Sequence, residues 1–187
     1  MRIAVLASGS GTLLEAMIQA DLPVALVVSD RKCRALEIAE AAMIPATLVE
    51  RTDWSSTFDR DVYALEVLEV LANHSADLVA MAGFGTVLGA SIFEAMPGRI
   101  INTHPALLPA FAGWHAVRQA LEYGVKVTGC TIHVATTVVD DGPILAQEAV
   151  SVEPGDDEAS LHERIKVVER RLYIDTIKDI DARGRVL

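Results

Sequence analysis

The sequence predicts an α/β fold, with a mostly parallel, twisted sheet that carries helices on both faces. Short aliphatic runs bounded by turn residues are typical of buried strands, and they occur at 2–7, 24–29, 46–49, 78–82 and 99–102. Segments with apolar residues at helical spacing lie between them at 13–20, 35–42 and 59–73. Repeated strand and helix units of this kind need right-handed crossovers, and these build a parallel sheet covered on both sides.

The sequence of the last third of the chain predicts a different pairing of strands. A β-branched stretch at 125–134 and an apolar stretch at 144–150 are typical of strands. The Asp-Asp-Gly-Pro turn at 140–143 lies between them, so an antiparallel or edge pairing is expected. A final helix is expected at 160–180, with residues 158–160 as its N-terminal cap.

Composition narrows the class of protein. With 187 residues, of which 51% are hydrophobic, the chain is long enough for one buried core and short for two, so a single domain over 1–187 is expected. A formal net charge of −10 disfavours nucleic acid as a partner. Cys33 and Cys130 form no disulfide framework, and no apolar run reaches the roughly 20 residues of a membrane span. We therefore expect a cytoplasmic protein that acts on small molecules, as a monomer or homodimer.

A glycine-rich turn, Ser-Gly-Ser-Gly-Thr at 8–12, follows the first strand and opens the first helix. Free backbone amides and the helix dipole at such a turn favour a phosphate, and they make the N-terminal half Rossmann-like. The turn lacks the ending of a Walker loop, and Leu14 replaces the third glycine of the dinucleotide fingerprint. Asp30 lies about where a ribose-binding acid would be, so a nicotinamide enzyme is a weaker alternative. The turn alone is also compatible with a plain strand-to-helix connection.

A second group of polar residues begins where the 99–102 strand ends, which is where open α/β sheets place their ligands. Asn102 and His104 are two residues apart, so in an extended chain both side chains leave on one face. Asn102 can donate its amide to an oxyanion, and a nearby Asp140 carboxylate would raise the pKa of His104 and favour the imidazolium. The three residues together suit the tetrahedral intermediate of acyl-type transfer to an amine. Taken singly, they are also compatible with a turn cap, a loop histidine and turn chemistry.

The order of these pieces along the chain resembles that of the folate-dependent formyltransferases. Asn-Thr-His-Pro at 102–105 and Asp-Asp-Gly-Pro-Ile at 140–144 carry the resemblance to the group. The glycine turn points to the phosphoribosylglycinamide formyltransferase family, which the segments 77–84, 113–121 and 129–133 also resemble. The resemblance covers nearly the whole chain and implies the formyltransferase fold.

This resemblance implies formyl transfer from 10-formyltetrahydrofolate to the amine of glycinamide ribonucleotide, in de novo purine synthesis. The family's catalytic residues match Asn102, His104 and Asp140. Its ribonucleotide-binding positions match Gly11, Thr12 and Leu13, through their backbone amides, and Glu169. Its folate-binding positions match Arg60, Gly85, Thr86, Val87, Leu88 and Asn102. No metal is expected.

Two segments depart from the family pattern. Leu13 stands where many members have asparagine, which removes a side-chain donor from the phosphate turn. Gly85-Thr86 replaces a larger pair, often Met-Arg, and this puts the shape of the pterin pocket in doubt.

Several alternatives stay open. A formyltetrahydrofolate deformylase uses a similar site to transfer the group to water, and a nucleotide-binding module could keep the fold without catalysis. Methionyl-tRNA formyltransferase shares the catalytic motifs but needs a tRNA-binding domain and a basic surface. A zinc site built from His104, His115, His133 and Asp140 would lack regular ligand spacing.

Overall fold

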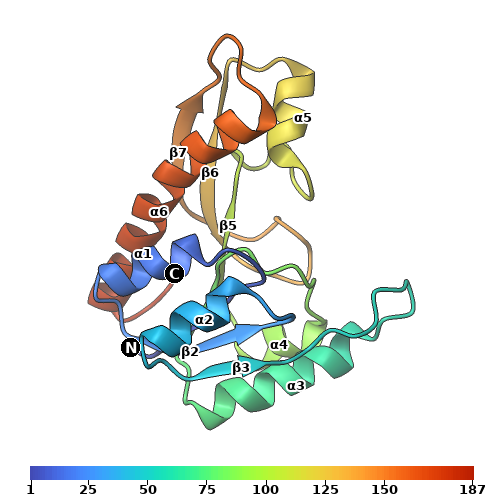
Figure 1. Cartoon of the computed structure of the whole chain (residues 1–187), viewed down its shortest axis with the longest axis vertical. Helices are drawn as coiled ribbons and strands as arrows, with labels where there is room; N and C mark the ends of the chain where they lie inside the picture. Colours follow the sequence, from blue (N-terminus) through green and yellow to red (C-terminus); the bar gives the residue numbers. More distant parts are fainter. The chain divides into compact units, whose positions relative to one another are not determined.

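Seven strands and six helices form the computed structural model, which describes residues 1–187, and they alternate along the chain except that β7 follows β6 directly (Figure 1). The strand order is β3-β2-β1-β4-β5-β6-β7. The chain divides into two compact units, residues 1–101 and 102–187. Strand β5 (Ile100–His104) contains the boundary between them.

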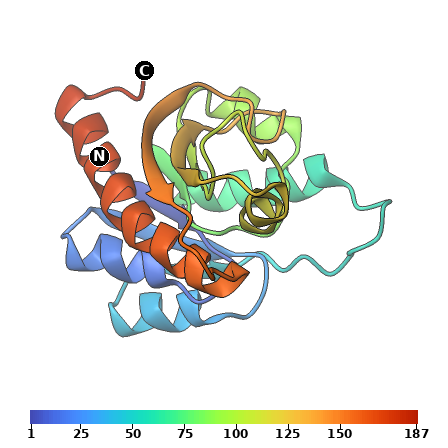
Figure 2. The same ribbon diagram turned by 90° about the horizontal axis from the view of Figure 1, so that it is seen from above.

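The first unit is a doubly wound parallel sheet. Its strands are β1 (Ile3–Leu6), β2 (Val24–Ser29), β3 (Ala46–Leu48) and β4 (Leu78–Met81), and β1 pairs in parallel with both β2 and β4. Its helices are α1 (Thr12–Gln19), α2 (Arg34–Ala41), α3 (Arg60–Asn73) and α4 (Ala90–Ala95). Helices α1 and α2 lie together on one side of these strands, and α3 and α4 lie on the other (Figure 2). All four residues of β1 are buried because both faces of the sheet are covered.

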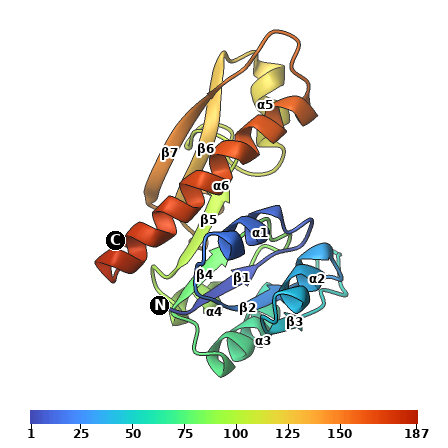
Figure 3. The same ribbon diagram turned by 60° about the vertical axis from the view of Figure 1, so that its left-hand side comes forward.

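The second unit pairs its strands differently. Strands β6 (Val127–Val134) and β7 (Ile144–Ser151) are antiparallel. Helix α5 (Ala116–Tyr123) precedes them, and the long helix α6 (Glu158–Arg183) runs along β6 and β7 (Figure 3). The parallel sheet and the antiparallel last pair predicted from the sequence are thus confirmed.

The start of α6 corrects one expectation. The cap is Asp157, whose carboxylate accepts a hydrogen bond from the Ser160 amide at 2.8 Å, while the Ser160 hydroxyl accepts one from the Asp157 amide at 3.0 Å. This reciprocal pair is a capping box, so Ser160 lies inside the helix instead of before it. Helices α4 and α5 were not expected from the sequence, and α4 has only six residues, which are too few to establish a helical period.

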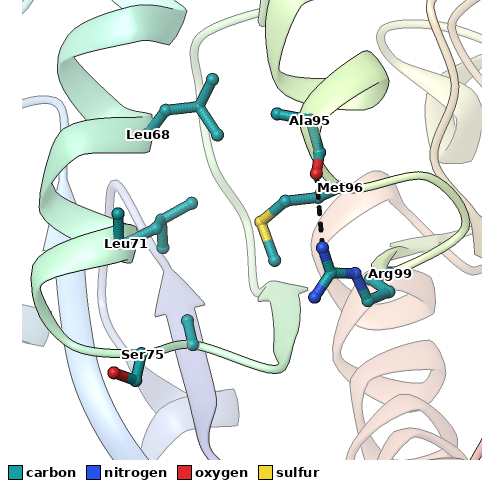
Figure 4. Close-up of a pocket in the computed structure, with 8 residues that line it drawn as sticks. Leu68, Leu71, Ser75, Ala95, Met96 and Arg99 are labelled. Atoms are coloured by element: carbon teal, nitrogen blue, oxygen red, sulfur yellow. Dashed lines mark hydrogen bonds between the residues drawn. The ribbon is translucent and has the colours of Figure 1, made fainter.

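A cavity of about 330 Å³ opens between α3 and α4 (Figure 4). Its lining is mostly apolar and includes Leu68, Leu71 and Met96. Arg99 is its one charged lining residue and donates to the Ala95 carbonyl at 3.3 Å. None of the residues predicted to act in catalysis or binding lines this cavity. No helix of the chain combines the length and apolar character needed to cross a membrane.

Two buried threonines on β6 have opposite surroundings. The Thr131 hydroxyl accepts hydrogen bonds from the Leu108 amide and the Gln147 side chain, both at 3.0 Å, and donates to the Ala106 carbonyl at 2.7 Å. It therefore fixes the backbone that follows His104. The Thr128 hydroxyl is the one buried side-chain polar group without a hydrogen-bond partner.

These surroundings predict opposite effects of the same substitution. Thr128→Val removes an unsatisfied hydroxyl at nearly constant shape, so we expect the free energy of unfolding to rise by about 1 kcal/mol. Thr131→Val leaves a buried amide and a buried carbonyl unpaired, so we expect it to fall by about 2–4 kcal/mol. Urea denaturation of both variants measures the difference, and equal effects of the two substitutions would contradict the assignment.

Candidate active site

His104 and Asp140 form a buried pair in the second unit. His104 ends β5 and is 5% exposed. Its Nδ1 lies 3.1 Å from Oδ2 of Asp140, and its Nε2 lies 2.8 Å from the carbonyl oxygen of Phe111. The same Asp140 oxygen accepts a hydrogen bond from the Gly113 amide at 2.8 Å. The imidazole is thus held between a carboxylate and a backbone carbonyl, both of which are acceptors.

Strained backbone surrounds this pair. Phe111 and Asp140 are non-glycine residues with left-handed φ values of 55° and 57°. Each such residue costs about 1–3 kcal/mol and persists only where its surroundings determine it. At Asp140 these surroundings are the hydrogen bond from Gly113 and the contact with His104. The strain therefore lies at the two residues that contact the imidazole.

Asn102 joins the pair through a second histidine. Its Nδ2 lies 3.2 Å from Nε2 of His133, and that nitrogen lies 3.5 Å from Oδ1 of Asp140. The other ring nitrogen of His133 lies 3.0 Å from the Val134 carbonyl. Nε2 of His133 therefore lies near both the Asn102 amide and the Asp140 carboxylate, and its protonation state determines which of the two it bonds. The structure thus brings Asn102, His104 and Asp140 together, with His133 as a link that the sequence grouped with them only in the zinc alternative.

Burial and charge act against each other in this cluster. Desolvation by burial lowers the pKa of His104, although the Asp140 carboxylate and the Phe111 carbonyl both raise it. The expected direction of the Asp140 effect is confirmed, but the expected net increase in the histidine pKa is wrong, because desolvation is the larger effect. Burial would raise the pKa of Asp140, yet hydrogen bonds from His133 and Gly113 and the charge of His104 lower it overall.

Glu169 is the remaining predicted site residue in the second unit. It lies on α6, where its Oε1 accepts a hydrogen bond from the Thr103 hydroxyl at 2.9 Å. His115 lies before α5 with a φ of 64° and is exposed. The chain contains no group of three or more His, Cys, Asp or Glu side chains arranged to hold a metal ion.

The glycine turn and the Gly85–Leu88 segment lie in the first unit. Gly11 has a φ of 70° and precedes α1, which has no side-chain cap. A Cβ on Gly11 would lie 2.7 Å from the Ile38 side chain and 3.0 Å from the Ala35 backbone, so glycine is required there. Thr12 is half-buried and Leu13 is buried, while Arg60 begins α3 and is exposed.

A buried carboxylate explains the Gly85-Thr86 departure. Asp30 is fully buried and accepts hydrogen bonds from Arg31 at 2.8 and 3.0 Å and from the Thr86 hydroxyl at 2.7 Å. A Cβ on Gly85 would lie 2.6 Å from the Arg31 guanidinium. Burial would raise the pKa of Asp30, but Arg31, Thr86 and Ser8 lower it overall. Gly85 thus leaves room for Arg31, and Thr86 supplies Asp30 with a further donor.

The α/β fold and the amide, imidazole and carboxylate cluster are typical of group-transfer enzymes that stabilise a tetrahedral intermediate. The family model described as "Formyl transferase" matches residues 1–177. Phosphoribosylglycinamide formyltransferase of Mycobacterium tuberculosis is 47% identical, over 98% of this chain and 86% of the relative. The Bacillus subtilis enzyme of the same name is 36% identical, over 96% of this chain and 94% of the relative.

A solved structure of a protein with the same name is similar to this chain. The crystal structure of phosphoribosylglycinamide formyltransferase from Bacillus halodurans has a TM-score of 0.90 and 39% identity to this chain. The match covers 100% of this chain and 98% of that one. The chain belongs to the formyl transferase family, and within it to the phosphoribosylglycinamide formyltransferases. Membership of this family implies a folate-derived formyl donor.

The lowered pKa of His104 predicts a neutral ring at pH 7. In a titration of the free protein by NMR, we expect the His104 ring to titrate below the ordinary value of 6.5. The His104→Ala spectrum assigns its signal among the five histidines. Asp140→Asn removes a charge that raises this pKa, so we expect the midpoint to move still lower. A midpoint above 6.5 would show that the Asp140 charge outweighs burial.

The surroundings of Asp30 predict a stability effect. Thr86→Val removes a hydrogen bond to a buried carboxylate, so we expect the free energy of unfolding to fall by about 1.5–3 kcal/mol at pH 7. Thr47→Val on β3, where no side-chain hydrogen bond is lost, is the control and should change it by less than about 0.5 kcal/mol.

The pH dependence of the same variant gives a second measurement. Because the folded pKa of Asp30 is lowered, its stabilisation is present above the ordinary carboxyl value of 3.8 and is lost as the pH falls through the folded value. Thr86→Val removes one interaction that lowers this pKa, so the loss should begin at a higher pH. Identical acid unfolding of the variant and the original protein would contradict this.

Proposed function

We propose that this protein transfers a formyl group from 10-formyltetrahydrofolate to the amine of glycinamide ribonucleotide, in de novo purine biosynthesis. The observation that carries the proposal is the buried contact between His104 and Asp140, next to Asn102, in a chain whose relatives are phosphoribosylglycinamide formyltransferases. Imidazole, carboxylate and amide are the groups that proton transfer and oxyanion stabilisation require.

The ribonucleotide is proposed to bind Gly11, Thr12, Leu13 and Glu169. The absence of a side-chain cap on α1 leaves its first backbone amides available to a phosphate. The buried Leu13 side chain takes no part in this, so its backbone amide would replace the contribution of an asparagine. Glu169 would accept a hydrogen bond from the same substrate.

The folate is proposed to bind Arg60, Gly85, Thr86, Val87, Leu88 and Asn102. The exposed Arg60 guanidinium suits a carboxylate of the donor. Hydrogen bonds of the Gly85 amide to Ser8 at 2.6 Å and of Thr86 to Asp30 fix the start of the 85–88 segment. A fixed backbone there would give a pterin ring stable hydrogen-bonding partners.

In the proposed reaction, the neutral substrate amine attacks the formyl carbon and forms a tetrahedral intermediate with a negative oxygen and a positive nitrogen. Asn102 donates an amide hydrogen to the oxygen. Because burial favours the neutral ring of His104, this ring acts as a base and takes the proton from the attacking nitrogen. It then gives the proton to the folate nitrogen as the carbon–nitrogen bond breaks.

Asp140 stabilises the imidazolium that exists between these two proton transfers. Nε2 of His104 has to exchange the Phe111 carbonyl for the reacting atoms, since Nδ1 faces Asp140. This mechanism revises the sequence-based hypothesis of a histidine that is protonated at rest, and it keeps the hypothesis that a proton passes through His104.

The remaining sequence-based expectations form part of the proposal. Residues 1–187 are proposed to act as one catalytic domain, supported by the uninterrupted family match over 1–177. We further propose that this domain is cytoplasmic and acts as a monomer or homodimer.

The experiment that tests the proposal combines the protein with glycinamide ribonucleotide and 10-formyltetrahydrofolate and follows the release of tetrahydrofolate. We expect turnover that depends on both substrates. Asp140→Asn should lower kcat/KM roughly 100-fold or more, because the imidazolium loses its stabilising charge. Asp141→Asn changes an exposed carboxylate in the same turn and is the matched control, with an expected change below about twofold.

Two outcomes would contradict the proposal. Release of tetrahydrofolate at the same rate without the ribonucleotide would indicate a deformylase that transfers the formyl group to water. Binding of the ribonucleotide without any turnover would indicate a nucleotide-binding module.

A further inference from the structure

Thr103 lies between two members of the catalytic cluster and faces the other way. Side chains alternate along a strand, so Thr103 leaves β5 on the face opposite to Asn102 and His104. Its hydroxyl donates to Oε1 of Glu169 at 2.9 Å. This contact joins the strand that carries the catalytic histidine to helix α6.

Cys130 completes a chain of hydrogen bonds. Its sulfur lies 3.4 Å from the Thr103 hydroxyl oxygen, and it is fully buried on β6. A hydroxyl has a single hydrogen, and Thr103 gives that hydrogen to Glu169. The thiol is therefore the donor to Thr103. Burial raises the pKa of Cys130 to about 12, so the thiol keeps this proton at neutral pH.

The second oxygen of Glu169 has no partner within the chain. Thr128 carries the one buried side-chain oxygen or nitrogen that lacks a hydrogen-bond partner. Oε2 of Glu169 has no hydrogen-bond partner within the chain and is not one of these fully buried, unsatisfied atoms. One carboxylate oxygen is thus fixed by Thr103, and the other keeps its capacity to accept a hydrogen bond.

We propose that Thr103 is a positioning residue, which holds the Glu169 carboxylate so that its free oxygen accepts a hydrogen bond from the ribonucleotide substrate. The inference rests on the proposed function, because it takes Glu169 as a ribonucleotide-binding residue. Glycinamide ribonucleotide offers N–H and O–H donors, and an ionised carboxylate accepts hydrogen bonds from them more strongly than a protonated one does. Thr103 acts on substrate binding through Glu169 and touches no reacting atom.

The charges around Glu169 determine how its binding of the ribonucleotide depends on pH. Burial raises the pKa of Glu169, while the Thr103 hydrogen bond and the Lys166 and Arg170 charges lower it. The other titratable groups nearby are Cys130 and Tyr173, and burial raises the pKa of both, so both stay neutral below pH 8. Loss of the Thr103 hydroxyl would therefore raise the pKa of Glu169 further and extend its neutral form to higher pH.

The first experiment compares Thr103→Val with Thr103→Ser in the formyl-transfer assay. Thr103→Val should raise the KM for glycinamide ribonucleotide about tenfold or more, which is the effect of losing a hydrogen bond to a charged group. The KM for 10-formyltetrahydrofolate should change less than twofold, and Thr103→Ser should restore most of the loss. Thr128→Val removes another buried hydroxyl from the same unit and is the matched control, with an unchanged KM.

The pH profile separates positioning from a general structural defect. The KM for the ribonucleotide should rise as the pH falls, because Glu169 becomes protonated, and this rise should begin at a higher pH in Thr103→Val than in the original protein. A structural defect alone would raise KM equally at every pH. An unchanged KM and an unchanged profile in Thr103→Val would overturn the inference.

Glu169→Gln alone covers the case in which Thr103→Val folds poorly, and a double-mutant cycle of the two tests whether they act through one contact. Glu169→Gln keeps an oxygen that can accept from Thr103 but replaces the free oxygen by an NH₂ group, so it should raise KM and remove its pH dependence. In the Glu169→Gln background, Thr103→Val should change KM less than twofold, because the carboxylate through which Thr103 acts is already absent. Additive effects would overturn the inference. If the unchanged protein transfers no formyl group to the ribonucleotide, the proposed function fails instead.

Discussion

The geometry of the cluster of Asn102, His104 and Asp140 depends on the position of the Asp140 carboxylate. Asp140 contacts the His104 ring and the Gly113 amide, and it does so with a left-handed backbone. Gly142, two residues later, passes so close to β6 that a Cβ there would lie 1.7 Å from the Val134 carbonyl oxygen. The Val134 amide also donates to the Pro143 carbonyl at 2.9 Å. The end of β6 thus fixes the turn, and the turn places the carboxylate against His104.

Burial gives this carboxylate its chemical effect. A charge removed from water is costly unless it is paired and hydrogen-bonded, and Asp140 meets this condition through Gly113, His133 and His104. The same burial lowers the pKa of His104 even though a carboxylate lies 3.1 Å away. A neutral ring can accept a proton, and a nearby ionised carboxylate lowers the energy of the imidazolium that results. The arrangement therefore favours the imidazolium that exists between the two proton transfers of the proposed reaction.

The sequence predicts those parts of the structure that depend on local pattern. Aliphatic runs identify the first five strands, β1 to β5, to within two residues at each end. Strand β2 at Val24–Ser29 agrees at both ends. The two-residue spacing of Asn102 and His104 places them on one face of β5. Features that depend on tertiary contacts could not be predicted. The link through His133 depends on the pairing of separate strands, and the pKa of His104 depends on how deeply the loops bury it.

Asp30 shows that each of the two units contains a buried, hydrogen-bonded carboxylate. Like Asp140, it follows a strand and is removed from water, and its pKa is lowered by donors that come from elsewhere in the chain. Its donors include Thr86, in the segment proposed to bind folate, just as the donors to Asp140 include Gly113, in the loop after His104. A loop position that leaves a buried carboxylate without hydrogen-bond donors is energetically unfavourable. In each unit this energetic cost fixes a loop that would otherwise be held only by the helices and strands at its two ends. The proposed chemistry requires loops that are fixed in this way.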